Sequence, residues 1–262
     1  MNAPGSPDTA GRVALVTGAA KRLGRAIALE LARAGWDIVV HYGSSRQDAE
    51  RTVDEIRALG RRAEALSCDL ADEAAVRELL PAANAALGPV RCIVNNASLF
   101  DYDAAADFSH AQLNRHMHVN LAAPVLLANA LAESTPEGQQ AVVVNLLDQK
   151  LYNLNPDFLS YTLSKAALDS ATTMLAQALA PRVRVVGVAP GLTLISHLQT
   201  EEEFCATRAI SPLGESSRPD EVAQAVVFAA GNRALTGSTL LVDAGQHLVR
   251  MARDFSLINR NT

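Results

Sequence analysis

Short apolar runs alternate with amphipathic stretches along most of this chain of 262 residues. The apolar runs have the length of buried strands, and the stretches between them have the 3.6-residue period of helices. We expect strands near 12–17, 37–42, 63–68, 92–95, 140–147, 184–188 and 237–243, and helices near 23–34, 47–59, 72–86, 110–131, 157–179 and 218–230. Such alternation builds βαβ units, and right-handed crossovers then give one doubly wound α/β domain with a seven-stranded parallel sheet flanked by helices.

Composition narrows the class of protein. A net charge of −5 and an aromatic content of 4% give no basic or stacking surface for nucleic acid. No apolar run reaches the roughly 20 residues of a membrane span. The three cysteines lie far apart, which favours free thiols and a reduced, cytoplasmic protein. Residues 1–10 have no apolar segment and predict a disordered leader, residues 11–250 the domain, and residues 251–262 a C-terminal tail.

A glycine turn joins the first strand to the first helix. The segment from Thr17 to Gly24 reads TGAAKRLG, and the helix begins near Leu23. In this arrangement the N–H groups of the helix N-terminus face an anion such as a dinucleotide pyrophosphate. The spacing meets only half of the general G-x-G-x-x-G pattern, so an ordinary tight turn is the alternative.

The end of the second strand indicates which dinucleotide binds. No acidic residue lies between Ile38 and Gln47, where an acid would hold the ribose 2′-hydroxyl of NAD. Hydroxyl and cationic residues stand there and in the glycine turn instead: Lys21, Arg22, Ser44, Ser45 and Arg46. This favours a 2′-phosphate and hence NADP, although solvated loop charges would look the same.

Tyr161 and Lys165 are four residues apart in the helix expected over 157–179. Residues at i and i+4 share a helix face, so the ammonium is expected to lower the pKa of the phenol and make it a usable acid. The same spacing also occurs in surface pairs. Asn120 is expected in the middle of a helix, where an amide side chain is a mild misfit. His116 and His118 are two residues apart and do not face each other on a helix, so no metal site is expected.

Taken in order, the motifs resemble those of the short-chain dehydrogenase/reductase family over about residues 11–250. They are Thr17-Gly18 with Gly24, Asp69, Asn95-Asn96-Ala97, Asn120, Tyr161 with Lys165, and Pro190-Gly191. The resemblance implies a Rossmann-type sheet, a nicotinamide cofactor and a homotetramer. It also implies that Tyr161 is the catalytic acid, that Lys165 holds the nicotinamide ribose, and that Asn120 anchors a proton-relay water.

Three departures from the family pattern point to its pteridine reductase branch. Arg22 replaces the middle glycine of the turn, Ser98 replaces the last glycine of N-N-A-G, and Asp148 replaces the catalytic serine thirteen residues before the tyrosine. The branch implies that Arg22 and Ser98 contact cofactor phosphate and substrate, that Asp148 protonates a ring nitrogen, and that Phe100 stacks on the pterin. Arg250 is implied to reach the site of a neighbouring subunit.

The cofactor residues implied together are Gly18, Lys21, Arg22, Leu23, Gly24, His41, Tyr42, Ser44, Ser45, Asp69, Leu70, Asn95, Ala97, Ser98, Tyr161, Lys165, Pro190, Gly191 and Leu192; the substrate residues are Arg22, Ser98, Phe100, Asp148, Tyr161 and Arg250. The usual His-Arg-Ser of the branch is missing after the second strand, where Gly43, Ser44 and Ser45 stand. The sequence therefore leaves open how the 2′-phosphate is held.

The chemistry expected is reduction of a C=N bond. Such a reduction needs a hydride on carbon and a proton on nitrogen, and an aspartic acid in an apolar crevice retains a proton at neutral pH. The hypothesis is an NADPH-dependent reductase of a pterin, dihydropterin or dihydrofolate-like substrate. The alternatives are a carbonyl reductase of the 3-oxoacyl or small-ketone type and a non-catalytic NADP-binding protein. The variable segment 192–217 and the tail are expected to shape the substrate pocket.

Overall fold

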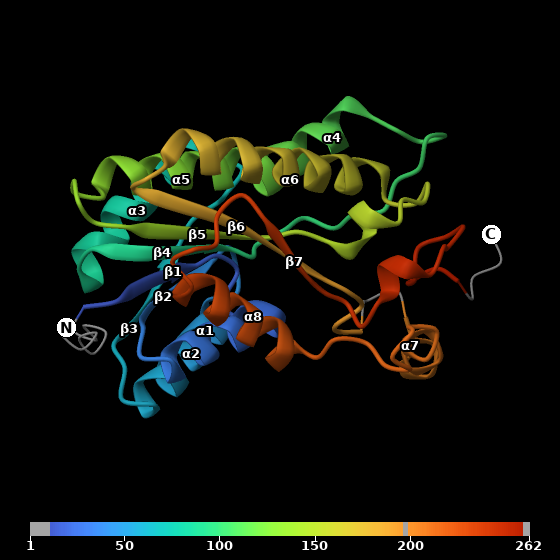
Figure 1. The fold of residues 1–262 in the computed structure, drawn as a ribbon, viewed down its shortest axis with the longest axis horizontal. Coiled ribbons are helices and arrows are strands. Elements are labelled where there is room, and N and C mark those ends of the chain that lie inside the picture. The colour runs from blue at the N-terminus through green and yellow to red at the C-terminus, as the bar shows by residue number, and fades with distance from the viewer. Residues whose placement is uncertain (1–10, 196–198, 259–262) are drawn as a thin grey trace.

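A seven-stranded parallel sheet is the centre of the molecule, a computed structural model that describes residues 11–195 and 199–258 (Figure 1). The strand order is β3-β2-β1-β4-β5-β6-β7, and each neighbouring pair is parallel. The strands are β1 Val13–Val16, β2 Asp37–Tyr42, β3 Ala63–Ser67, β4 Val90–Asn95, β5 Ala141–Leu146, β6 Val183–Pro190 and β7 Thr239–Val242. The predicted seven-stranded, doubly wound sheet is confirmed.

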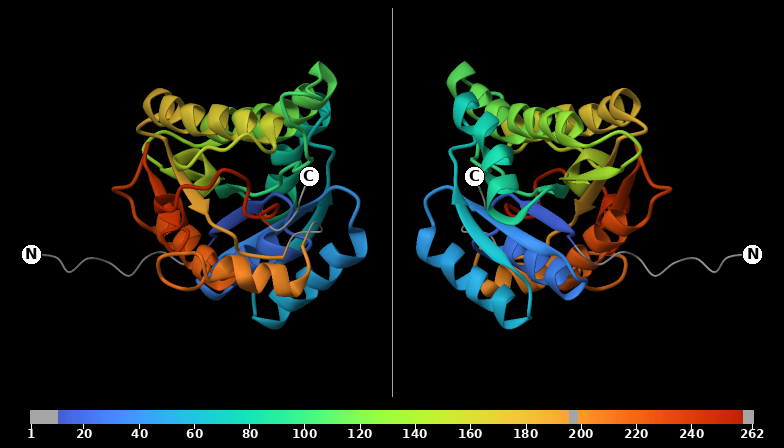
Figure 2. Two further views of the ribbon diagram at one scale, coloured as in Figure 1. Left: turned by 90° about the vertical axis from the view of Figure 1, so that its right-hand side faces the viewer. Right: turned by 90° about the vertical axis from the view of Figure 1, so that its left-hand side faces the viewer.

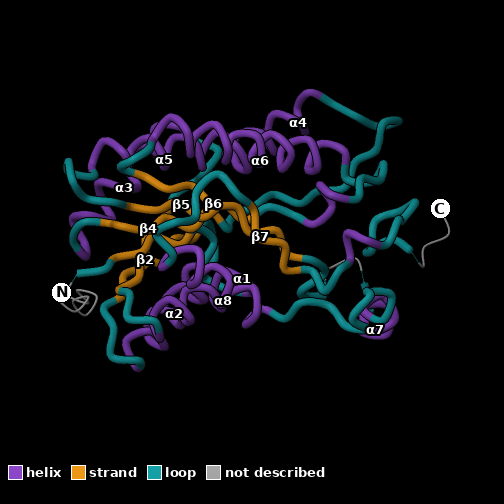
Figure 3. The backbone as a smooth tube through the Cα atoms, in the orientation of Figure 1, coloured by secondary structure: helices purple, strands orange, loops and turns teal. Residues whose placement is uncertain are grey.

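Helices cover both faces of this sheet (Figures 2 and 3). Helices α1 Arg22–Arg33, α2 Arg46–Ala58 and α8 Pro219–Gly231 lie on one face, and α3 Glu73–Leu87, α4 His110–Met117, α5 Ala123–Ser134 and α6 Leu159–Leu179 lie on the other. Each face has its own apolar core. Strands β1 and β5 are buried along their whole length, which explains why they read as continuous apolar runs.

The helix predicted over 110–131 consists of three segments. Between α4 and α5 lies a π-helical turn, His118–Ala122, and Pro124 is in the first turn of α5. Proline has no N–H to donate and is tolerated at a helix start. Pro124 therefore fits the first turn of α5, and the helical irregularity lies just before it, around Asn120.

The segment 192–217, expected to have no strong period, contains a short helix, α7 Glu201–Arg208. Thr200 accepts a hydrogen bond from the N–H of Glu203, whose side chain accepts one from the N–H of Thr200. This capping box was readable as T-x-x-E in the sequence. Helical turns at Gln149–Tyr152 and Gln246–Leu248 complete the fold.

No helix within residues 11–195 and 199–258 is long and apolar enough to span a bilayer. The leader expected at 1–10 and the last four residues of the tail lie outside the described residues.

Candidate active site

The residues singled out in the sequence gather at the carboxyl edge of the sheet. The glycine turn follows β1; His41, Tyr42, Ser44 and Ser45 lie at the end of β2; Asp69 and Leu70 follow β3; Asn95, Ala97 and Ser98 end or follow β4; and Pro190, Gly191 and Leu192 end or follow β6. Parallel strands bring these segments together because all of their carboxyl ends meet at one edge.

The glycine turn fits closely against the start of α1. A Cβ on Gly24 would lie 2.2 Å from the carbonyl oxygen of Gly18, so only glycine fits there. Arg22, which replaces the family's middle glycine, has the left-handed φ of 54° that favours glycine. Its guanidinium donates to the carbonyl of Ile195 at 2.8 Å. The N-cap residue of α1, Lys21, makes no side-chain cap, so the turn retains N–H groups that fit a phosphate.

The hydroxyl of Thr17 fixes the end of β4 to this turn. It donates to the carbonyl of Val94 and accepts from the N–H groups of Asn96 and Ala97, both at 3.0 Å. The side chain of Asn96 donates in turn to the carbonyl of Thr17 at 2.9 Å. One threonine and one asparagine therefore hold the two strand ends in register for a ligand.

His41 lies behind the glycine turn and is fully buried. Its Nδ1 accepts from the N–H of Gly18 at 3.0 Å, so Nε2 carries the proton and donates to the carbonyl of Cys68. Burial lowers the pKa of His41 and keeps the ring neutral. His41, expected among the cofactor residues, therefore positions the turn from behind.

Residues after β2 form the start of a second helix. Ser45 is the N-cap residue of α2 and makes no side-chain cap. Arg46 pairs with Glu50 at 2.8 Å, and Ser44 and Lys21 are exposed. Two serines and a helix N-terminus are the groups this edge offers to a 2′-phosphate.

Tyr161 and Asp148 form the centre of the site. The phenol of Tyr161 donates to Oδ2 of Asp148 at 2.6 Å, and Oδ1 accepts from the N–H of Lys150 at 2.8 Å. Burial raises the pKa of Asp148 above its ordinary value. Burial and the charge of Asp148 raise the pKa of Tyr161 as well. Both shifts favour the protonated form of the group concerned.

Lys165 lies beside this pair and donates to the carbonyl of Leu146 at 2.7 Å. Its Nζ is 5.9 Å from the centre of the Tyr161 ring, and burial lowers the pKa of Lys165 to about 8. The expectation that the pKa of Tyr161 is lowered is wrong for this structure, because desolvation and the neighbouring carboxyl of Asp148 raise it.

Asn120 is buried in the π turn, and its amide holds three segments together. Oδ1 accepts from the N–H of Leu99 at 2.8 Å and from the hydroxyl of Ser98, while Nδ2 donates to the carbonyl of Leu99 and to Ser164 at 2.9 Å. A π turn in the middle of a helix is frequent at functional sites. The misfit seen in the sequence is explained by these bonds, and the relay water remains a prediction.

A cavity of about 240 Å³ opens onto the Asp148–Tyr161 pair. Its lining includes the predicted Arg22, Phe100, Asp148, Tyr161, Gly191 and Leu192, together with Gln149, Thr193, Leu194, Asp254, Phe255 and Ser256, which the sequence did not single out individually. Phe100 stacks on Phe158 with ring centres 4.2 Å apart and meets Tyr161 edge-on at 4.7 Å. Ser98 and Arg250 are exposed and do not line this cavity.

The tail closes the cavity of its own chain. Lys150, which is buried, donates to Asp254 at 2.9 Å and to the carbonyl of Asp157 at 2.6 Å. Arg253 pairs with Asp157 at 2.8 Å. These bonds place Phe255 and Ser256 in the cavity wall. The tail was expected to shape the substrate pocket, and residues 253–257 dock on their own domain beside the cavity.

The short chain dehydrogenase family model matches residues 12–204. An uncharacterized oxidoreductase of Methylorubrum extorquens is 32% identical over 243 residues, covering 90% of this chain and 97% of that protein. The 3-oxoacyl-[acyl-carrier-protein] reductase FabG of Staphylococcus aureus is 28% identical, covering 90% and 98%. The structure of FolM alternative dihydrofolate reductase 1 from Brucella canis, complexed with NADP, is 41% identical with a TM-score of 0.89 and coverages of 94% and 98%.

We predict that Lys150→Met releases the tail. Breaking a buried ion pair leaves an uncompensated carboxylate and costs about 3 kcal/mol in the free energy of unfolding, measured by urea denaturation. Hydrogen exchange of residues 250–258 should accelerate as well. Arg77→Met, which breaks an exposed pair with Glu73, is the control and should cost less than about 1 kcal/mol. Unchanged exchange in the tail of Lys150→Met would contradict the role of this ion pair.

Proposed function

The chain belongs to the short-chain dehydrogenase family, and we propose that it uses NADPH to reduce a C=N bond of a pterin, dihydropterin or dihydrofolate-like substrate. It is an NADP-dependent oxidoreductase, and the proposal concerns what it reduces. The observation that carries the proposal is the 2.6 Å hydrogen bond between Tyr161 and Asp148 at the wall of the cavity.

The cofactor residues fit a bound dinucleotide. The close packing of Gly24 on Gly18 brings the uncapped start of α1 to the end of β1, where its N–H groups would face a phosphate. Ser44 and Ser45 stand at the start of α2. Nicotinamide supplies the hydride when it is bound. Lys165, held by the carbonyl of Leu146, is close enough to Tyr161 to contact the ribose beside it.

The protein supplies the proton. Reduction at a ring nitrogen consumes one proton there, and burial, which raises the pKa of Asp148, favours the protonated carboxyl that would supply it. The phenol of Tyr161 donates a hydrogen bond to this carboxyl and would stabilise the carboxylate that is left when the proton is given up. Phe100, beside Tyr161, offers an aromatic surface to a flat heterocycle.

The comparisons support this substrate class. Two structures of FolM alternative dihydrofolate reductase 1, from Brucella canis and Brucella suis, are 41% and 40% identical to this chain and were solved with NADP. The reductase FabG, at 28% identity, represents the competing carbonyl chemistry. The carboxyl of Asp148 favours the first class, because it can give a proton to a ring nitrogen, whereas the serine usual at this position only donates a hydrogen bond to a carbonyl oxygen.

We also propose a homotetramer in the cytoplasm. A hollow on α5 and α6 is lined mainly by apolar side chains, namely those of Leu121, Ala122, Val125, Leu126, Ala167, Ala171 and Met174, with Glu73 and Ser170. Met174 is 66% exposed in the single chain, which is unusual unless a partner covers it. Three free thiols suit a reducing compartment.

Asp148→Ser is expected to lower kcat for dihydrobiopterin or dihydrofolate by about 10²–10⁴-fold, the range of general acid catalysis. NADPH binding, followed by fluorescence titration, should be unchanged. Asp101→Asn, at a partly exposed carboxyl paired with Arg115 outside the cavity, is the matched control. Undiminished pterin turnover by Asp148→Ser, or faster turnover of a 3-oxoacyl ester than of any pterin by the wild type, would reject the proposal.

The pH dependence should follow the protonation of Asp148. Because the acid form is active and its pKa is raised, kcat/KM should be flat at low pH and fall about tenfold per pH unit above that pKa. A second fall is expected near pH 8, where Lys165 loses its charge. In Asp148→Ser the first fall should vanish and the second should persist. An activity that rises with pH would contradict this assignment.

Met174→Glu should disrupt assembly, because it buries a charge in the interface proposed on α5 and α6. Light scattering after size exclusion should give a tetramer for the wild type and a smaller species for the variant. Leu213→Glu, at a residue that is 75% exposed elsewhere, should leave the mass unchanged. A monomeric wild type would refute the assembly.

A further inference from the structure

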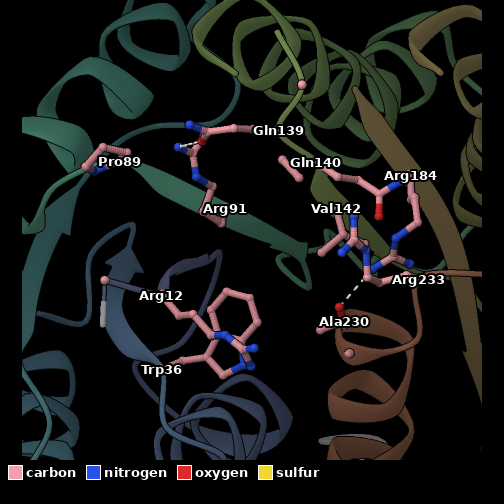
Figure 4. Close-up of a pocket in the computed structure, with 14 residues that line it drawn as sticks. Arg12, Trp36, Pro89, Arg91, Gln139, Gln140, Val142, Arg184, Ala230 and Arg233 are labelled. Carbon is pink, nitrogen blue, oxygen red and sulfur yellow. Dashed lines mark hydrogen bonds between the residues drawn. The ribbon is translucent and has the colours of Figure 1, made fainter. Parts of the chain in front are cut away.

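Four arginines line one hollow at the amino-terminal edge of the sheet, opposite to the active site (Figure 4). Arg12 precedes β1, Arg91 is in β4, Arg184 is in β6, and Arg233 follows α8. The strand order β1-β4-β5-β6 brings the first three to the same edge. The hollow measures about 550 Å³, and no Asp or Glu is among the described residues that line it.

These four guanidinium groups have no carboxylate partner among the described residues. Arg12 lies over the ring of Trp36, 5.7 Å from its centre, and Arg91 donates to the side-chain oxygen of Gln139. By contrast, Arg61 and Arg62 nearby share the carboxylate of Asp37 at 2.7 and 2.8 Å. The arrangement in the hollow is thus a concentration of positive charge in a chain whose net charge is −5.

Arg184 gives the strongest indication that a ligand binds here, because it carries a charge and is only 6% exposed. Its terminal nitrogens donate to the carbonyls of Ala229, Ala230 and Leu235 at 2.8–3.0 Å, which caps the end of α8. Its Nε is buried without a hydrogen-bond partner. Burial lowers the pKa of Arg184, and the charge of Arg233 lowers it further. The helix cap accounts for the burial of the terminal nitrogens of Arg184. It accounts neither for the unpartnered Nε nor for the second cation, Arg233, beside it.

An anion in the hollow would compensate the adjacent charges of Arg184 and Arg233. Figure 4 shows Arg184 and Arg233 close together on one side of the hollow, with Arg12 and Arg91 on the other. Guanidinium groups present forked donors that match phosphate oxygens. A neighbouring hollow of about 470 Å³ shares Arg233 and adds Arg182 and one acid, Glu137. The volume suits a small ligand and not an extended polymer.

We propose that this hollow binds a small anion of the phosphate class that carries at least two negative charges. Arg91 and Arg233 form its two accessible sides, and Arg184 forms its buried side. The site is separate from the cofactor site, since it lies at the other end of the strands, and it does not depend on the proposed reaction.

The test is a calorimetric titration of the full chain with sodium tripolyphosphate at constant ionic strength. Excess NADP⁺ is present, so that the nucleotide site proposed above is occupied. We expect saturable binding of one equivalent. Arg233→Gln and Arg91→Gln, at sites where little of the fold depends on the side chain, should each weaken it about tenfold, as loss of one charge-assisted contact does. Arg77→Gln on α3 removes an equal charge elsewhere and should bind as the wild type does.

Two outcomes would overturn the proposal. One is the absence of saturable binding up to millimolar tripolyphosphate. The other is equal binding by the wild type, Arg91→Gln and Arg233→Gln. Citrate, of similar charge but with carboxylate oxygens, tests the ligand class: weaker binding of citrate supports a phosphate ligand, and equal binding refutes that class.

Discussion

The contact between Gly18 and Gly24 is the constraint on which the rest of the site depends. Helix α1 starts against the end of β1 with a separation that leaves no room for a Cβ at residue 24. The same missing side chain lets Asn96 reach the turn, where Thr17 holds the end of β4. Two strand ends and one helix start are therefore fixed together, and the ligand-binding edge is rigid before any ligand arrives.

Buried charge is handled differently at the two edges of the sheet. At the carboxyl edge, Lys150 is matched by Asp254, and Lys165 by a main-chain carbonyl and the nearby carboxyl of Asp148. At the amino edge, Arg184 is buried with carbonyl partners alone and with another guanidinium beside it. Desolvation of a charge is costly unless it is compensated. The first edge is electrostatically complete within the chain, whereas the arginine hollow at the second edge has no Asp or Glu among its described lining residues.

The sequence predicts the features of the fold and the site that depend on local patterns. Apolar runs such as Ala141–Leu146 are buried on both faces, so strand positions follow from composition, and parallel topology then places Asp148 and Tyr161 at one edge. Other features depend on partners distant in sequence. Asn120 in the π turn bonds to Leu99, and the tail docks through a pair of residues 104 positions apart, Lys150 and Asp254. The sequence does not predict the arginine hollow, because each arginine alone resembles an ordinary charge at a strand end.

The reversal of the expected pKa of Tyr161 changes how the site is understood. Helical spacing correctly placed Lys165 beside the phenol, but the lysine donates to Leu146 and the phenol donates to Asp148. Burial raises the pKa of the phenol and of the carboxyl, so it favours the protonated form of both groups. Asp148 and Tyr161 therefore favour protonated groups beside the cavity over an anion there. A serine at position 148 would offer one hydrogen bond to a carbonyl oxygen. An aspartic acid can give up a proton, which is what a reduced ring nitrogen requires.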